Sequence, residues 1–211
     1  MNTILNNHTS LLRLGAEGVS LLLHPYGIAL WMTLMIMCGW ASPLDFPSNV
    51  QVYVVVNVVF MTILVPLVFG LFLRRVGKRV VDGGQRRRRL MQLGVLALCY
   101  GACGWMFDDI VVLFLVRKVM YTLSFVTLLT LCLEFYRSVS YRMVAMGALL
   151  AMMWMLLYVG NVALLVPFVL FVLGCGLLFS ARLYLGSDSP YELIVGLLLG
   201  LVSALIIFVQ I

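Results

Sequence analysis

Two short polar segments carry most of the side chains that could do chemistry in this chain. The first is Ser138-Val139-Ser140-Tyr141-Arg142, and the second is SARLYLGSDSPYE, which runs from Ser180 to Glu192. Each lies between two long apolar stretches. Hydroxyls, arginines and carboxylates in this setting suit two roles. They hold a phosphate group, or they neutralise one another, as ionisable groups beside lipid must.

The second segment resembles the third sequence motif of the type 2 phosphatidic acid phosphatase (lipid phosphate phosphatase) superfamily, which reads S-R-x5-H-x3-D and often SRxxLGxHxPxDxxAGxxxG. The family's histidine position holds Asp188 here, and its aspartate position holds Glu192. The positions in register are Arg182, Leu185-Gly186, Pro190, Gly196 and Gly200.

The resemblance extends to parts of the family's other motifs and covers about residues 55–211. The second motif, P-S-G-H, falls on the first segment, where Ser140 matches and Arg142 stands at the histidine position. The first motif, K-x6-R-P, is not found before it. Short bacterial members of the superfamily are similar in layout, with a basic run two spans before the second motif, and Arg86 to Arg89 resemble that run.

The missing histidines decide what the resemblance implies for activity. In the family one histidine attacks phosphorus, an aspartate orients it, a second histidine protonates the leaving group, and Lys and Arg neutralise the phosphoryl oxygens. This chain has two histidines, His8 and His24, both in or beside the first apolar stretch. We therefore expect an inactive member with a vestigial site. That site would comprise Ser140, Arg142, Arg182, Asp188 and Glu192.

Ion pairing is the role that we predict for the vestigial site. Arg142 or Arg182 should lie within salt-bridge distance of Asp188 or Glu192, because breaking a buried pair costs about 3–5 kcal/mol. The competing hypothesis makes Asp188 the nucleophile of a divergent phosphatase. Aspartyl-phosphate chemistry exists, but a carboxylate facing an anionic phosphate with no metal or acid beside it is a poor arrangement.

The composition places these segments in a membrane protein. Hydrophobic residues make up 64% of the chain and charged residues 10%, and the mean hydropathy is +1.13. A soluble domain is about half apolar and a quarter charged, so soluble, disordered and disulfide-stapled classes are excluded. We predict an all-α, polytopic membrane helical bundle with about seven transmembrane helices (range six to seven). Residues 1–18 would form an interfacial segment, and residues 19–211 a single transmembrane domain.

Seven apolar stretches support the larger count, since each is near the ~20 residues that cross a ~30 Å hydrocarbon core. They are 19–40, 50–73, 90–107, 110–135, 143–159, 162–180 and 192–211. Their apolar residues are continuous rather than alternating, which favours helices over barrel strands. We expect the third and fifth to be short or tilted.

The basic residues give the predicted orientation. With seven spans, the N-terminus shares one side with the loops 74–89, 136–142 and 181–191, and that side carries twelve Lys and Arg while the other carries none. Positive loops stay in the cytoplasm, so we expect an inner-membrane protein with its C-terminus outside. The basic residues of the cytoplasmic loops then account for the net charge of +6. The charge therefore does not call for a nucleic-acid partner, and none is predicted. The Arg-rich loop 74–89 should turn at Gly83-Gly84.

Two charges inside the fourth stretch have two readings. Arg117 and Lys118 lie seven to eight residues from its end. They either snorkel toward Asp108 and Asp109 or form an internal polar site with Asn57 or a partner subunit.

Small residues and cysteines are read as packing groups. Gly196, Gly200 and Ala204 repeat every four residues, which permits close packing within the chain or a homodimer. No metal site or cofactor is predicted, because none of the cysteines has enough ligands beside it. The five cysteines are Cys38, Cys99, Cys103, Cys132 and Cys175.

The leading functional hypothesis is a protein resembling lipid phosphate phosphatases that has lost catalysis and binds an anionic lipid or a membrane protein partner. The alternatives are an active, divergent lipid or isoprenyl phosphate phosphatase and a structural subunit of a membrane complex. The candidate ligands for a phosphate or lipid headgroup are Arg86, Arg87, Arg88, Arg89, Arg142 and Arg182.

Overall fold

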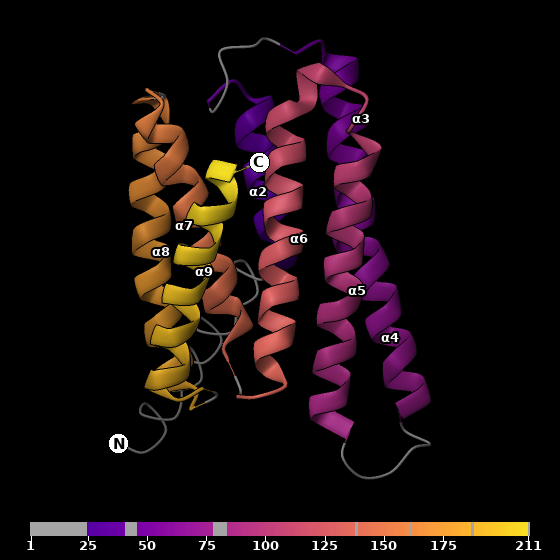
Figure 1. Cartoon of the computed structure of the whole chain (residues 1–211), viewed down its shortest axis with the longest axis vertical. Helices are drawn as coiled ribbons and strands as arrows, with labels where there is room; N and C mark the ends of the chain where they lie inside the picture. The colour runs from indigo at the N-terminus through magenta and orange to yellow at the C-terminus, as the bar shows by residue number, and fades with distance from the viewer. Residues whose placement is uncertain are drawn as a thin grey trace, which may run out of the picture.

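The computed structural model describes residues 25–40, 46–77, 84–137, 139–160, 162–186 and 188–210, and the regular structure within these ranges is all helical. Seven continuous helices run up and down through a bundle (Figure 1). Three of them begin or continue through a short 3-10 or π segment. Their bounds are α2 (Pro25–Met37), α3 (Ser48–Val59) with η1 (Phe60–Leu64) and α4 (Val65–Gly77), α5 (Gly84–Met106), η2 (Val111–Leu113) with α6 (Phe114–Glu134), α7 (Tyr141–Tyr158), η3 (Val162–Leu164) with α8 (Leu165–Tyr184), and α9 (Pro190–Gln210).

Five of these helices are long and apolar enough to cross a membrane. They are Ser48–Phe72, Val111–Glu134, Tyr141–Tyr158, Val162–Tyr184 and Pro190–Gln210. A shorter apolar helix spans Gly27–Met37, and the N-terminal segment predicted for residues 1–18 lies outside the described residues. The all-helical prediction is confirmed, and a multi-pass membrane protein is the class that these five helices support.

The basic loop predicted for residues 74–89 is wrong in its bounds. Helix α4 continues to Gly77 and α5 begins at Gly84, so Arg86 to Arg89 are helical. Arginine is a good helix former, and its charge ends a membrane span without ending the helix. The third apolar stretch, predicted to begin at residue 90, is therefore part of a longer helix of 23 residues.

The helices form two closely packed pairs joined through the middle of the bundle. Helix α5 packs on α6, and α7 packs on α9, while α6 also contacts α7 and α9. Helix α8 lies against α7 at one edge of the view, and α4 lies at the opposite edge (Figure 1). This arrangement brings the α6–α7 and α8–α9 connections to the same end of the bundle.

Three glycines allow α7 and α9 to approach closely. A Cβ atom on Gly200 would overlap the carbonyl oxygen of Val144, and one on Gly147 would overlap that of Leu197. A Cβ on Gly196 would lie 2.9 Å from the Ser140 carbonyl oxygen. Gly196, Gly200 and Ala204 are all buried, so the small-residue stripe packs within the chain.

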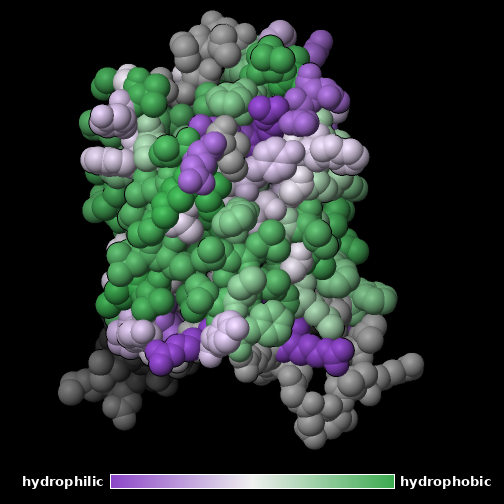
Figure 2. All heavy atoms as spheres, viewed as in Figure 1, coloured by the Kyte–Doolittle hydropathy of each residue, from purple (hydrophilic) through white to green (hydrophobic). Residues whose placement is uncertain are grey.

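Polar and aromatic side chains gather toward the two ends of the bundle. In Figure 2 the middle of the visible face is mainly green, and the purple residues lie mainly above and below it. Trp105 and Tyr158 are exposed near one end, and Tyr136, Tyr184 and Tyr191 are exposed near the other. Aromatic rings at both ends of an apolar band are typical of proteins that lie between two membrane interfaces.

Candidate functional site

The candidate site lies where α8, α9 and the start of α7 meet. Arg182 is in the last turn of α8, and the chain turns at Gly186, whose φ of 59° is left-handed and therefore suits glycine. Asp188 follows this turn, just before α9. Ser140 immediately precedes Tyr141, the first residue of α7. Residues 48 positions apart in the sequence are thereby placed side by side.

One carboxylate oxygen holds these three side chains together. Asp188 Oδ2 accepts hydrogen bonds from Arg182 Nη2 at 2.7 Å, from Arg182 Nε at 2.9 Å and from Ser140 Oγ at 2.8 Å. The side chains of Arg182 and Asp188 are only 13% and 10% exposed. The predicted salt bridge is therefore confirmed for Arg182 and Asp188. We call Ser140, Arg182 and Asp188 the Asp188 cluster.

The Asp188 cluster is a neutralised structural unit as it stands. Charge-assisted hydrogen bonds are roughly twice as strong as neutral ones, and here three of them, two from Arg182 and one from the Ser140 hydroxyl, converge on a single carboxylate oxygen. The carboxylate takes up two donor groups of Arg182 that would otherwise suit an external oxyanion. The cluster can fasten the α8–α9 turn to the start of α7. Within it, Arg182 is already paired with the carboxylate of Asp188.

Glu192 closes a capping box at the start of α9. The Ser189 N–H donates to Glu192 Oε2 at 3.0 Å, and the Glu192 N–H donates to Ser189 Oγ at 3.3 Å. This reciprocal pair satisfies two backbone N–H donors at the start of the helix. The S-x-x-E spacing of Ser189 and Glu192 is the sequence signal for this capping box.

Glu134 belongs to the same end of the bundle and was missed by the sequence analysis. It is the last residue of α6, only 4% exposed, and its Oε2 accepts a hydrogen bond from the Val139 N–H at 3.0 Å. The bond fixes the loop that carries Ser140. A carboxylate at the end of an apolar stretch, five residues before a backbone N–H that needs an acceptor, was the available signal.

The remaining predicted headgroup ligands do not join the Asp188 cluster as one group. Arg142 is half-buried in the first turn of α7, with its guanidinium 5.8 Å from the centre of the Tyr141 ring. Arg87 and Arg89 are exposed on α5, which lies across the bundle from α8 (Figure 1). The side chains of Arg86 and Arg88 lie outside the described residues. The predicted ligands therefore occupy at least two separate places.

An exposed arginine from the α6–α7 loop reaches toward α9. Arg137 Nη1 donates to the Tyr191 hydroxyl at 3.5 Å, and both residues are exposed. Arg75, Arg87 and Arg89 are also exposed near this end of the bundle. The described residues include no exposed carboxylate here, since Glu134, Asp188 and Glu192 are buried or half-buried. We call this end, with these four arginines, the basic end.

The two charges inside α6 lie toward the opposite end. Arg117 Nη1 donates to Asp108 Oδ1 at 2.8 Å and to the Asp108 carbonyl at 3.1 Å, which agrees with the snorkelling alternative. Lys118 Nζ lies 4.7 Å from the centre of the Phe208 ring and 5.5 Å from that of Phe114. Asn57 donates to the Tyr53 carbonyl of its own helix. Arg117 and Asn57 thus have hydrogen-bond partners within the chain, and the Lys118 ammonium lies against two aromatic rings of the chain.

Comparison of this chain with protein-family models, with curated proteins and with solved structures gave no match.

Proposed function

We propose that the protein is a non-catalytic, seven-span inner-membrane protein with a core like that of the lipid phosphate phosphatases. Its vestigial site serves as a structural ion cluster, and its basic end binds anionic phospholipid. Helix α5 and the segment containing α2 would complete the seven spans beside the five long apolar helices. A helix of 18 residues such as α7 is about 27 Å long, which suits a hydrocarbon core of about 30 Å.

The observation that carries this proposal is the set of hydrogen bonds that Asp188 accepts. Asp188 stands at the histidine position of the motif in the resembling family. Its Oδ2 accepts three hydrogen bonds from Arg182 and Ser140. Ser140 stands at the serine position of the family's second motif and Arg182 at the arginine position of the third. The arginine position, whose counterpart in the resembling family would neutralise phosphoryl oxygens, thus meets a built-in carboxylate here. Pairing with Arg182 and Ser140 neutralises the carboxylate and makes it a weaker nucleophile, so the contacts favour structure over catalysis.

The basic end supports the orientation and the lipid class. Arg75, Arg87, Arg89 and Arg137 are exposed there, and Asp108 and Asp109 are exposed at the opposite end. Positive residues near span ends favour the cytoplasmic side. That leaflet is rich in anionic lipid, which attracts each nearby Lys or Arg by about 1 kcal/mol. The basic end is therefore proposed to face the cytoplasm.

The lipid that remains on the purified protein tests this function. We expect protein extracted from vesicles of equal phosphatidylglycerol and phosphatidylcholine to retain an excess of phosphatidylglycerol, measured by native mass spectrometry. Combined glutamine substitution of Arg75, Arg87, Arg89 and Arg137 should clearly reduce this excess, because it removes the four arginines that are exposed at this end among the described residues. Arg117→Gln, at the opposite end, is the control and should keep the excess.

Two outcomes would count against the proposal. Equal retention of both lipids by the unmodified protein would remove the lipid function. A membrane protein that co-purifies in fixed stoichiometry, without a lipid preference, would favour the structural-subunit alternative instead.

A further inference from the structure

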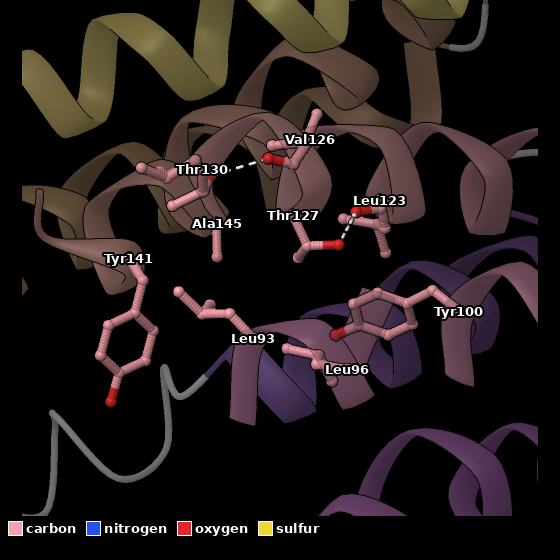
Figure 3. Close-up of a pocket in the computed structure, with 10 residues that line it drawn as sticks. Leu93, Leu96, Tyr100, Leu123, Val126, Thr127, Thr130, Tyr141 and Ala145 are labelled. Atoms are coloured by element: carbon pink, nitrogen blue, oxygen red, sulfur yellow. Dashed lines mark hydrogen bonds between the residues drawn. The ribbon is translucent and has the colours of Figure 1, made fainter. Parts of the chain in front are cut away.

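The space between α5, α6 and α7 leaves no room for a lipid inside the bundle. Side chains of the three helices face one another across it (Figure 3). Eight of its ten lining residues are buried, and it has room for about one water molecule. A phospholipid that binds beside these helices therefore lies on the outer surface, where its headgroup meets exposed side chains.

Arg137 and Tyr191 form an exposed polar contact at the basic end. Arg137 lies in the turn after α6, and Tyr191 lies in the first turn of α9, 54 positions later in the sequence. Arg137 Nη1 donates to the Tyr191 hydroxyl at 3.5 Å, which is a long hydrogen bond. A guanidinium carries several further N–H groups, and the phenol keeps its own proton. Both side chains therefore retain donors for an external oxyanion.

The loop that carries Arg137 is held at several points. The Arg137 N–H donates to the Leu133 carbonyl at 2.8 Å, and the Val139 N–H donates to the Glu134 carboxylate at 3.0 Å. The Asp188 cluster joins the end of this loop to the α8–α9 turn. Arg137 is thereby placed beside the start of α9 before any ligand binds, which reduces the entropy lost on binding.

Tyr191 begins an exposed row on α9. It lies between Ser189 and Glu192, whose capping box fixes the first turn of the helix. Its side chain is 61% exposed, and Ile194 and Leu198 follow it at helical spacing and are also exposed. Tyrosine rings favour the headgroup level of a membrane. The row therefore offers a polar contact at the basic end and an apolar surface leading away from it.

We propose that Arg137 and Tyr191 together bind the phosphate of an anionic phospholipid, whose acyl chain lies along the exposed row of α9. The guanidinium supplies a positive charge and the phenol a neutral donor, and both can donate to phosphate oxygens. Among the described residues, this end has no exposed carboxylate to compete for them. The inference rests on the proposed function of the basic end and gives that function a defined headgroup site.

The unmodified protein provides the first test. The probe is phosphatidylglycerol with a diazirine on its headgroup, in vesicles of phosphatidylglycerol and phosphatidylcholine. Photolabel is expected on the segments around Arg137 and Tyr191, and unlabelled phosphatidylglycerol should compete it about fivefold better than phosphatidylcholine does. Excess inorganic phosphate should leave the label in place. Displacement by inorganic phosphate would overturn the lipid as the source of the phosphate, and absence of label from both segments would overturn the site.

Matched variants separate a defined site from a general attraction to positive charge. Tyr191→Phe removes one donor without changing the charge and should reduce the advantage of phosphatidylglycerol about threefold. Tyr184→Phe, at another exposed tyrosine of this end, should leave it unchanged. Arg137→Gln should reduce the advantage about fivefold, whereas Arg87→Gln, at an exposed arginine on α5, should not. Equal effects within either matched pair would overturn the shared phosphate contact.

The retained-lipid measurement distinguishes failure of this site from failure of the proposed function. An excess of phosphatidylglycerol on the purified protein, without label around Arg137 and Tyr191, would refute this site and leave the proposed function standing. Equal retention of the two lipids together with absence of label would refute both.

Discussion

Gly200→Ala is expected to destabilise the protein by about 3 kcal/mol, at the upper end of what overpacking usually costs. The added methyl group would overlap the backbone carbonyl of Val144 on α7, which cannot move away as a flexible side chain could. Separation of α7 from α9 would also disturb Ser140, which lies one residue before α7. The thermal unfolding midpoint in mild detergent, with the monodisperse fraction, measures this loss.

The chain supplies a graded series of controls for the same substitution. Alanine at Gly147 should be nearly as damaging, since its Cβ would overlap the Leu197 carbonyl. Alanine at Gly196 should cost less, because the nearest atom lies 2.9 Å away. Gly176→Ala meets nothing within 4 Å and should be neutral or slightly stabilising, as alanine favours helix. Equal stability of the Gly200 and Gly176 variants would contradict the close α7–α9 packing.

Breaking the Asp188 cluster is the second large expected effect. Asp188→Ala and Arg182→Ala should each cost about 3 kcal/mol, because each leaves a nearly buried charge without its counter-ion. The double variant should cost clearly less than the sum, with a coupling of about 2 kcal/mol. Unfolding free energies of the four proteins in one detergent give the coupling directly.

The Arg117–Asp108 pair is the matched control for this cycle. Its side chains are 28% and 51% exposed, and exposed pairs contribute about 0–1 kcal/mol. The same double-mutant cycle at Arg117 and Asp108 should therefore give a small coupling. Couplings of similar size for the two pairs would show that the Asp188 cluster is an ordinary surface contact.

Much of the fold follows from the sequence, because long apolar runs have few alternatives in lipid. In the part of the chain that the structure describes, seven helices correspond to the seven predicted stretches, and five of them could cross a membrane. The bounds of the predicted stretches are wrong where the apolar run and the helix end at different residues. The apolar run begins only after Arg86 to Arg89, yet helix α5 includes these four arginines. Hydropathy reports the preferred solvent of a side chain, whereas a helix ends where its backbone hydrogen bonds stop.

The candidate site was predicted in part. The motif register placed Ser140, Arg182 and Asp188 at positions that the structure brings together. The role of Glu192 was not predicted, although the spacing of Ser189 and Glu192 is that of a capping box. The role of Glu134 was not predicted because the position of the Val139 N–H depends on the turn between them.

Phosphate release is the measurement that tests the central claim most directly. The unmodified protein, reconstituted in vesicles, is given phosphatidic acid and, separately, an isoprenyl diphosphate, and free phosphate is measured against protein-free vesicles. Because the Asp188 carboxylate is held by Arg182 and Ser140, we predict no release above that background with either substrate. Release that Asp188→Asn abolishes would contradict the structural role of the cluster and identify Asp188 as a working catalytic group.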